Sequence, residues 1–241
     1  MHQQQDDTEN ITYLSDTERI FSEEGQKFQG EKYLPKIERV RQYLRPDAQR
    51  SLDVGIGYGL FMIFTERELG LTSHGLDPFP KSIEIARQYT SAEIKEGAIE
   101  DSDWQYPEGH FDFISCLDVT EHLEEPAAFY RNVQKYLAPG GLVLMTTPNR
   151  SFAYEMRSWP LIGIPDKNTT HINVQAPSYW DRLAKEHGFE IVDSWRGEHL
   201  THVRVLPGLM QRFCNVLGLD PKTTPVVNRF QQAYNQILRV K

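Results

Sequence analysis

One stretch of the chain decides the fold: Leu52-Asp53-Val54-Gly55-Ile56-Gly57-Tyr58-Gly59. A short apolar strand over residues 51–54 runs into it, and a helix is predicted to begin near Tyr58. Glycines at such a junction let the backbone turn tightly and approach a ligand closely. A dinucleotide-binding dehydrogenase would show the spacing G-x-G-x-x-G, whereas this turn has G-x-G-x-G. A tight turn that binds no ligand is the alternative interpretation of the motif by itself.

Strands and helices alternate on both sides of this turn. Strands are predicted over 51–54, 73–76, 93–95, 111–117, 142–146 and 189–194, and helices over 14–29, 31–44, 58–69, 81–89, 127–137 and 178–187. Alternation at this spacing predicts βαβ units and a mostly parallel sheet with helices on both faces. The predicted fold class is therefore α/β, a doubly wound, Rossmann-like sheet of the seven-stranded type with helical caps.

Three regions are expected along the chain. Residues 1–45 would form an N-terminal helical cap, and residues 46–196 the core, with a lid insertion at about 150–175. Residues 197–241 would form a C-terminal helical extension, with helices near 207–217 and 225–238. The last strand of the sheet is not obvious in the sequence. Residues 237–240 are a candidate fragment of it; otherwise the chain is a piece of a longer protein that carries a further strand or domain.

The composition argues against several classes of function. The net charge of -8 disfavours a general nucleic-acid binder or a polybasic membrane surface, because both need clustered Lys and Arg. Two cysteines, Cys116 and Cys214, form neither a metal-type pair nor a disulfide framework. No apolar stretch approaches the roughly 18 residues of a membrane span. We expect a cytoplasmic protein without nucleic-acid or membrane partners.

An acidic residue ends the next predicted strand after the glycine turn and its helix. Asp77 closes the strand after the first helix, within Gly75-Leu76-Asp77-Pro78. A carboxylate at that place can accept two hydrogen bonds from a ribose diol. The alternative is an Asp that caps the helix beginning near Lys81. The preceding glycine turn favours ribose binding.

Further motifs follow in a fixed order: FDFISCLDVTEHL over 111–123, LAPGGLVL over 137–144, TPN over 147–149 and HIN over 171–173. Together with residues 51–61 and 75–78, they resemble the motifs of class I methyltransferases. Within that class they are similar to the small-molecule branch that contains the ubiquinone-pathway O-methyltransferases. The resemblance covers residues 51–195, well over half of the chain.

The resemblance implies a methyl donor, S-adenosylmethionine, and a product, S-adenosylhomocysteine. It implies a set of donor-binding residues: Asp53, Gly55, Gly57, Gly59, Asp77, Pro78, Phe79, Ile99, Glu100, Leu117 and His122. The glycines would lie at the methionine part, Asp77 at the ribose and Phe79 beside the adenine. Many relatives have an Asp that contacts the adenine amino group where this chain has Ala98. In this chain, Glu100, Asp101 or the Ile99 backbone would make that contact instead.

Three ligand-type residues, Asp118, Glu121 and His122, lie at i, i+3 and i+4. A helix over 119–123 would place them on one face. Some ubiquinone-pathway relatives are thought to bind a divalent cation with residues of this type. The alternative, which we favour, has no metal: Asp118 caps the helix, and His122 lies at the cofactor or lines the active site as a base.

A long connection, residues 152–168, precedes His171, and connections of that length are often functional. Trp159 is expected in an apolar lid over the substrate, with His171 as a substrate contact or second base. We expect methyl transfer to an oxygen, hydroxyl or carboxylate, of a small molecule or short peptide in secondary metabolism. Nitrogen or carbon acceptors, a nicotinamide-dependent oxidoreductase, a non-catalytic binding module and a nucleic-acid methyltransferase are the alternatives.

Overall fold

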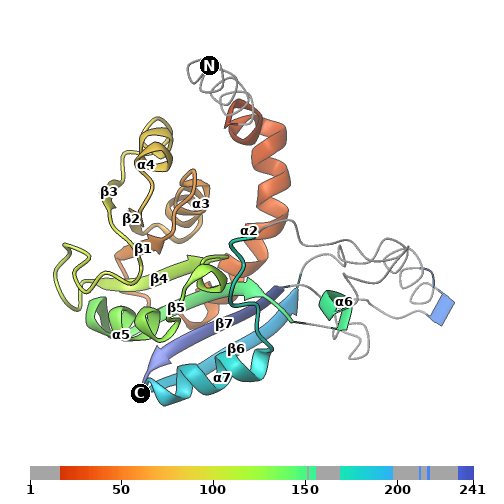
Figure 1. Ribbon diagram of the computed structural model, residues 1–241. Coiled ribbons are helices and arrows are strands. Elements are labelled where there is room, and N and C mark those ends of the chain that lie inside the picture. The colour runs from red at the N-terminus through yellow and green to blue at the C-terminus, as the bar shows by residue number, and fades with distance from the viewer. Residues whose placement is uncertain (1–16, 151, 156–168, 198–211, 213–215, 218–232) are drawn as a thin grey trace, which may run out of the picture.

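A seven-stranded sheet forms the centre of the computed structural model (Figure 1), which describes residues 17–150, 152–155, 169–197, 212, 216–217 and 233–241. The strand order is β3-β2-β1-β4-β5-β7-β6. The strands are β1 Arg50–Val54, β2 Thr72–Asp77, β3 Glu93–Glu96, β4 Phe111–Leu117, β5 Leu137–Pro148, β6 Phe189–Gly197 and β7 Ala233–Val240. All neighbouring pairs are parallel except those of β7, which runs antiparallel to both β5 and β6. The predicted α/β, doubly wound and mostly parallel sheet is confirmed.

Helices cover both faces of the sheet (Figure 1). They are α2 Glu23–Tyr43, α3 Leu60–Leu69, α4 Pro80–Ala86, η1 Thr120–His122, α5 Ala127–Tyr136, α6 Phe152–Glu155 and α7 Pro177–Glu186. One buried cluster joins α5 and α7 to the sheet through residues such as Phe129 and Trp180. A second cluster joins α2 and α3 to the opposite face through residues such as Val40 and Phe64. Apolar burial on both faces explains why β1 and β4 consist almost entirely of buried residues.

The N-terminal helix differs from its prediction. A single helix, α2, runs through both Gly25 and Pro35, where the sequence suggested two separate helices. It begins at Ser22, whose side chain accepts a hydrogen bond from the backbone N–H of Gly25. Tyr33 packs edge-on against the rings of Phe61 and Phe64 of α3. This packing supports the helix where its own sequence is unfavourable.

The helix predicted over residues 225–238 is wrong from Ala233 onward, where the structure has β7. This strand lies between β5 and β6 and completes the sheet. Two of its buried polar side chains bind other elements: the side-chain carbonyl of Asn235 accepts from Thr146 Oγ1 at 2.8 Å, and Gln236 Nε2 donates to Asp181 of α7. Gln236 Oε1 is buried without a hydrogen-bond partner in the described structure. The helical spacing of its apolar residues concealed a strand that is buried on both faces. The predicted helix over 207–217 falls largely outside the described residues, and the predicted division into cap, core and extension stays a prediction.

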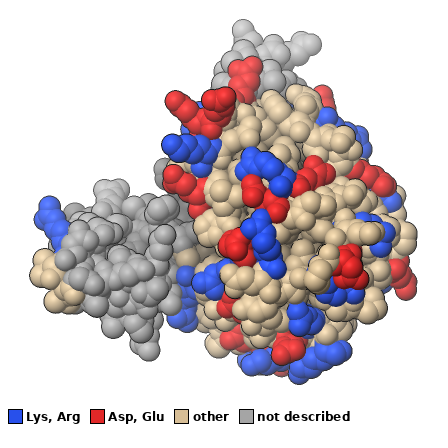
Figure 2. Space-filling view, turned by 180° about the vertical axis from the view of Figure 1, so that it is seen from behind, with Lys and Arg blue, Asp and Glu red and all other residues tan. Residues whose placement is uncertain are grey.

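The other helices and strands lie within a few residues of their predicted positions, with two differences. β5 begins at Leu137, so Gly140 and Gly141 lie within an irregular first part of the strand and not in a turn before it. β6 extends to Gly197. Figure 2 shows Lys and Arg interspersed with Asp and Glu over one face. Among the described residues, no helix has both the length and the apolar character needed to cross a membrane.

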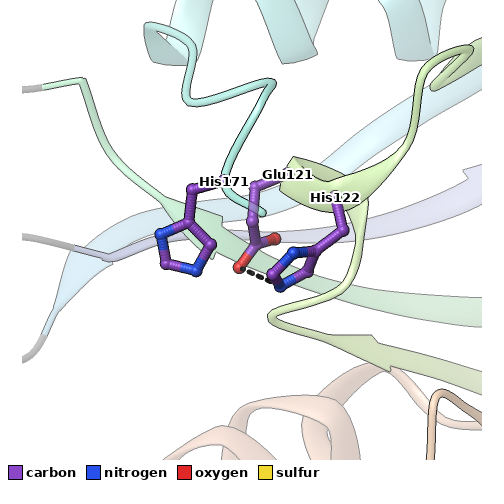
Figure 3. A group of neighbouring side chains, drawn as sticks. All are labelled: Glu121, His122 and His171. Carbon is purple, nitrogen blue, oxygen red and sulfur yellow. Dashed lines mark ion pairs between the residues drawn. The ribbon is translucent and has the colours of Figure 1, made fainter. Parts of the chain in front are cut away.

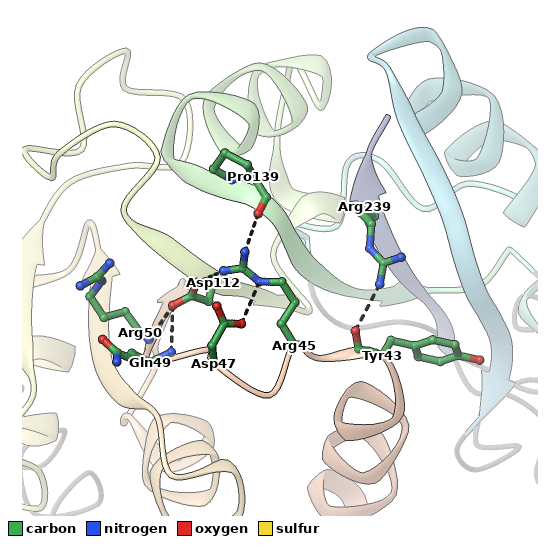
Figure 4. Close-up of polar contacts among 8 residues, drawn as sticks. All are labelled: Tyr43, Arg45, Asp47, Gln49, Arg50, Asp112, Pro139 and Arg239. Carbon is green, nitrogen blue, oxygen red and sulfur yellow. Dashed lines mark hydrogen bonds and ion pairs between the residues drawn. The ribbon is translucent and has the colours of Figure 1, made fainter.

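A polar network fastens the α2–β1 connection to the start of β4 (Figure 4). The buried carboxylate of Asp112 accepts from the backbone N–H groups of Gln49 and Arg50 at 2.9 and 3.0 Å. It also accepts from the Arg45 guanidinium at 2.6 Å, and Arg45 donates in turn to the carbonyl of Pro139. Burial favours the neutral carboxyl, but these donors outweigh burial and hold the pKa of Asp112 below its usual value.

We expect Asp112→Ala to lower the free energy of unfolding by about 3 kcal/mol, because two backbone N–H groups and a guanidinium lose their acceptor. Urea denaturation at neutral pH measures this loss. Asp47→Ala is the matched control, because the exposed Asp47 carboxylate also pairs with Arg45, at 3.6 Å. Because the folded-state pKa of Asp112 is depressed, its contribution is present above the unfolded pKa and disappears as the pH falls through the folded value. Equal stability of the two variants would contradict this role.

Candidate active site

The predicted site residues gather at the carboxyl ends of the central strands. β1 lies between β2 and β4, so the turns that follow these three strands are neighbours. The chain order reverses between β1 and β4, and ligands of doubly wound sheets bind at that point. Asp53, Asp77 and Leu117 each lie at or next to the end of one of these strands.

The glycine turn after β1 has a backbone that requires glycine. Gly55, Gly57 and Gly59 have φ values of 77°, 52° and 79°. A Cβ atom on Gly55 would lie 2.4 Å from Cγ2 of Val119, so a side chain there would also push away the segment after β4. Gly59 is the N-cap of α3. The turn therefore presents backbone at the head of a helix, as a close-fitting ligand site requires.

Asp77 organises the turn from the neighbouring strand. Its buried carboxylate accepts from the backbone N–H of Gly57 at 3.1 Å and from that of Phe79 at 2.9 Å. Burial raises the pKa of this carboxyl, although the two N–H donors act in the opposite direction. The second of these bonds is an Asx-type contact that shapes the exit from β2. Asp77 thus connects the glycine turn to the loop that carries Phe79.

Asp53 lies deeper, one residue before the end of β1. Its carboxylate accepts a hydrogen bond from the hydroxyl of Ser115 of β4 at 2.6 Å. Burial raises the pKa of Asp53 to about 7; the Ser115 hydroxyl lowers it, and the nearby Asp77 carboxylate raises it further. Sequence reasoning did not single out Ser115, which the parallel register of β1 and β4 places beside Asp53.

The residues expected beside the adenine fall into two groups. Pro78 and Phe79 are exposed, and the Phe79 ring is free of other rings in the described structure. Ile99, by contrast, packs its side chain into the core, and its carbonyl accepts from Asn132 Nδ2 at 2.8 Å. Asp101 accepts from the backbone N–H of Ala98, while Glu100 is exposed. An adenine contact by Asp101 would compete with that hydrogen bond.

The segment after β4 differs from the predicted helix. Only Thr120–His122 is helical, as a single 3₁₀ turn, and its N-cap is Val119, without a side-chain hydrogen bond. The predicted capping role of Asp118 is therefore wrong. Asp118 has a left-handed backbone (φ 56°), and its carboxylate pairs with Lys32 of α2 at 3.0 Å. This ion pair, which sequence reasoning missed, ties the N-terminal helix to the site.

Glu121, His122 and His171 form one cluster (Figure 3). One ligand-type atom from each lies within 4.8 Å of the others. The two imidazole rings have centroids 4.8 Å apart, and Nε2 of His122 lies 4.0 Å from Oε1 of Glu121. Glu121 is 1% exposed, whereas both histidines are partly accessible. The sequence predicted the two histidines for the site, and the structure brings them together with a buried carboxyl.

Backbone and side-chain contacts hold the cluster together across about fifty residues of chain. The backbone N–H of Asn173 donates to the carbonyl of Glu121 at 2.8 Å, and the Asn173 side chain donates to the carbonyl of Leu123. Nδ1 of His122 contacts the carbonyl of Thr170 at 3.1 Å and its hydroxyl at 2.9 Å. The carbonyl can only accept, so the first contact is a hydrogen bond in the tautomer that carries the ring proton on Nδ1. In the neutral ring, Nε2 then keeps its lone pair and faces Glu121.

This arrangement permits two kinds of chemistry, which are proton abstraction by a histidine and the binding of a divalent cation. Burial raises the pKa of Glu121 to about 8, with a smaller contribution from the Asp118 carboxylate. A neutral imidazole with a fixed tautomer is a suitable general base near neutral pH. Two histidines and one carboxylate are also a common ligand set for a divalent cation, with the Thr170 carbonyl as the partner that orients His122. Trp159, the other predicted substrate contact, lies outside the described residues.

A family model described as a methyltransferase domain matches residues 25–194. The chain belongs to this family and is a class I S-adenosylmethionine-dependent methyltransferase. This assignment replaces the nicotinamide-dependent oxidoreductase considered from the sequence. Figure 1 and the strand order agree with the Rossmann-like sheet of that class.

Curated relatives support the same class. The chain is 28% identical over 181 residues to a ubiquinone biosynthesis O-methyltransferase of Neisseria meningitidis serogroup A, covering 73% of this chain and 66% of the relative. It is 31% identical over 121 residues to one of Xanthomonas axonopodis pv. citri, covering 48% and 50%. The matched region thus spans less than two thirds of the length of these relatives.

Solved structures share the fold at lower identity. A SAM-dependent methyltransferase from Archaeoglobus fulgidus has a TM-score of 0.60 at 16% identity, covering 88% of this chain and 97% of that one. A putative methyltransferase in complex with the Haloferax volcanii Trm112 methyltransferase activator has a TM-score of 0.63 at 12% identity, covering 93% and 97%. At these identities the likeness concerns the fold alone.

Proposed function

We propose that this chain transfers the methyl group of S-adenosylmethionine to a hydroxyl oxygen of a small molecule or short peptide. The observation that carries the proposal is the cluster of His122, His171 and the buried carboxyl of Glu121, in which the two ring centroids lie 4.8 Å apart. A weakly acidic hydroxyl must lose its proton during transfer, and a histidine base suits that task. The names of the curated relatives, ubiquinone biosynthesis O-methyltransferases, support an oxygen acceptor.

The donor needs little chemical help from the protein. Its methyl carbon is activated by a positive sulfur, and transfer is an in-line displacement. The glycine turn and Asp77 would hold the donor, so that its methyl group points toward the acceptor. Positioning of the two reactants and exclusion of water then supply most of the rate enhancement. A base removes the acceptor proton as the new bond forms.

A carboxylate acceptor is the nearest alternative, because it needs orientation and no base. Nitrogen or carbon acceptors would also use the same donor site. A panel of phenols, alcohols, carboxylic acids and amines separates these outcomes when products are scored by mass gain of one methyl group. Methylation of hydroxyl compounds is the expected result. Donor binding without turnover on any member of the panel would instead support a non-catalytic binding module.

A divalent cation at Glu121, His122 and His171 is the second candidate for this cluster, supported by the spacing of their ligand atoms. We expect treatment with EDTA to leave methyl transfer unchanged, because the histidines act as bases in the favoured proposal. Titration with Mn²⁺, followed by its electron paramagnetic resonance signal, provides an independent measurement. Loss of turnover in EDTA, with recovery in Mg²⁺ or Mn²⁺, would assign the cluster to a metal ion. Glu121→Gln should then weaken Mn²⁺ binding.

A further inference from the structure

Ser115 makes a short, buried contact with the acidic residue of the glycine turn. In the parallel register of β1 and β4, Ser115 is the direct partner of Asp53. Its hydroxyl donates to Asp53 Oδ1 at 2.6 Å and lies 3.4 Å from the carbonyl of Leu52. Both side chains are buried, at 2% and 5% exposure. A charge-assisted hydrogen bond of this length strongly favours an ionised acceptor.

The surroundings of Asp53 otherwise oppose its ionisation. Burial acts most strongly, and the carboxylate of Asp77 on the neighbouring strand β2 adds repulsion. On β4, the Cys116 thiol is also close enough to interact with Asp53, and burial keeps that thiol neutral. Ser115 is thus the side chain on these packed strands that favours the charged form of Asp53.

We propose that Ser115 is a positioning residue for the methyl donor, which acts by orienting the Asp53 carboxylate and keeping it ionised. The donor and its product both carry an ammonium group on the methionine part, and the class places that part at the glycine turn. An ionised Asp53 next to the turn supplies the matching negative charge. A neutral Asp53 would leave the ammonium group without that partner. The inference concerns donor binding alone, so it stands or falls independently of the acceptor.

The inference makes a statement about pH. As the pH rises through about 7, Asp53 loses its proton, and affinity for a ligand that carries an ammonium group should increase. Removal of the Ser115 hydroxyl leaves burial and Asp77 unopposed, so the pH at which affinity rises should move upward. A shift of one unit, from about 7 to about 8, lowers the ionised fraction of Asp53 at pH 7 from about one half to about one eleventh, which corresponds to about fivefold weaker binding.

Calorimetric titration with S-adenosylhomocysteine between acidic and alkaline pH tests this for four proteins: wild type, Ser115→Ala, Asp53→Asn and the double variant. We expect Ser115→Ala to bind about fivefold more weakly at pH 7 and to recover at higher pH. Asp53→Asn should lose the part of the pH dependence that Ser115 influences. In that background, Ser115→Ala should have no further effect on the pH midpoint.

Three results would overturn the inference: an unmoved midpoint in Ser115→Ala, uniform weakening at every pH, or the same shift when Asp53 is already Asn. Ser115→Thr keeps a hydroxyl and should keep the wild-type midpoint. If Ser115→Ala fails to fold, Ser115→Thr provides the test. A folded Ser115→Thr protein with a shifted pH midpoint would also contradict the proposal. Failure of methyl transfer with intact donor binding would count only against the proposed acceptor chemistry.

Discussion

Asp77→Ala should weaken binding of S-adenosylhomocysteine by about 100-fold, because two charge-assisted hydrogen bonds to a ribose diol are lost together. The structure adds a second reason for a large effect. The same carboxylate accepts the N–H groups of Gly57 and Phe79, so it also shapes the turn and the loop that face the donor. Calorimetric titration at neutral pH measures the change.

The control separates charge from shape. Asp77→Asn keeps one acceptor oxygen for the turn but removes the negative charge, so it should retain more affinity than the alanine variant. Thermal unfolding of each variant shows whether the turn itself has collapsed. Micromolar binding by a folded Asp77→Ala protein would mean that the donor lies elsewhere, and the placement of the cofactor on β2 would be wrong.

His171→Ala and His122→Ala should each lower the turnover of a hydroxyl acceptor by about 100-fold, the typical contribution of a general base. Their effects should not add in the double variant, because both rings belong to one cluster with Glu121. Affinity for S-adenosylhomocysteine should change much less, since the glycine turn and Asp77 remain. Single-turnover methylation assays with saturating donor provide the measurement.

His187→Gln is the matched control for these two variants. His187 is the C-cap residue of α7, where its ring contacts the carbonyl of Leu183 within the same helix. This variant should keep wild-type turnover. Full activity in both active-site variants would exclude the histidines as bases and would favour an acceptor that needs no deprotonation, such as a carboxylate.

The glycine turn and the position of Asp77, which we propose for the donor, were predictable as structural features because their requirements are local. The glycine turn is an unbroken segment whose positive φ angles only glycine adopts readily, and Asp77 ends the next strand. The adenine contact by the Ile99 backbone stays a prediction: the Ile99 side chain belongs to the core, and its carbonyl is bound by Asn132 of α5. That contact joins segments about thirty residues apart, so no local sequence pattern predicts it.

The grouping of His122 and His171, which we propose for the acceptor, depended on folding. The sequence put His122 and His171 forward through a resemblance, but neither the exposure of a ring nor its tautomer follows from the chain order. The hydrogen bonds of Asn173 and Thr170 bring the second segment onto the 3₁₀ turn, so that His171 joins His122 and the buried Glu121 in one cluster. The contact between Lys32 and Asp118 also depends on folding, because Lys32 lies on a helix far away in the sequence.

By itself, the sequence determined the alternation of strands and helices and the glycine turn, because periodicity and backbone freedom are properties of neighbouring residues. The class of the protein was indicated by the resemblance of its ordered motifs to a known family. The tertiary structure decided that α2 continues through Pro35 and that Ala233–Val240 is a strand. Both outcomes depend on partners supplied from elsewhere: aromatic rings of α3 for the helix, and Thr146 and Asp181 for the buried polar side chains of β7. A buried polar group is stable only where another segment completes its hydrogen bonds, and that segment exists only in the folded chain.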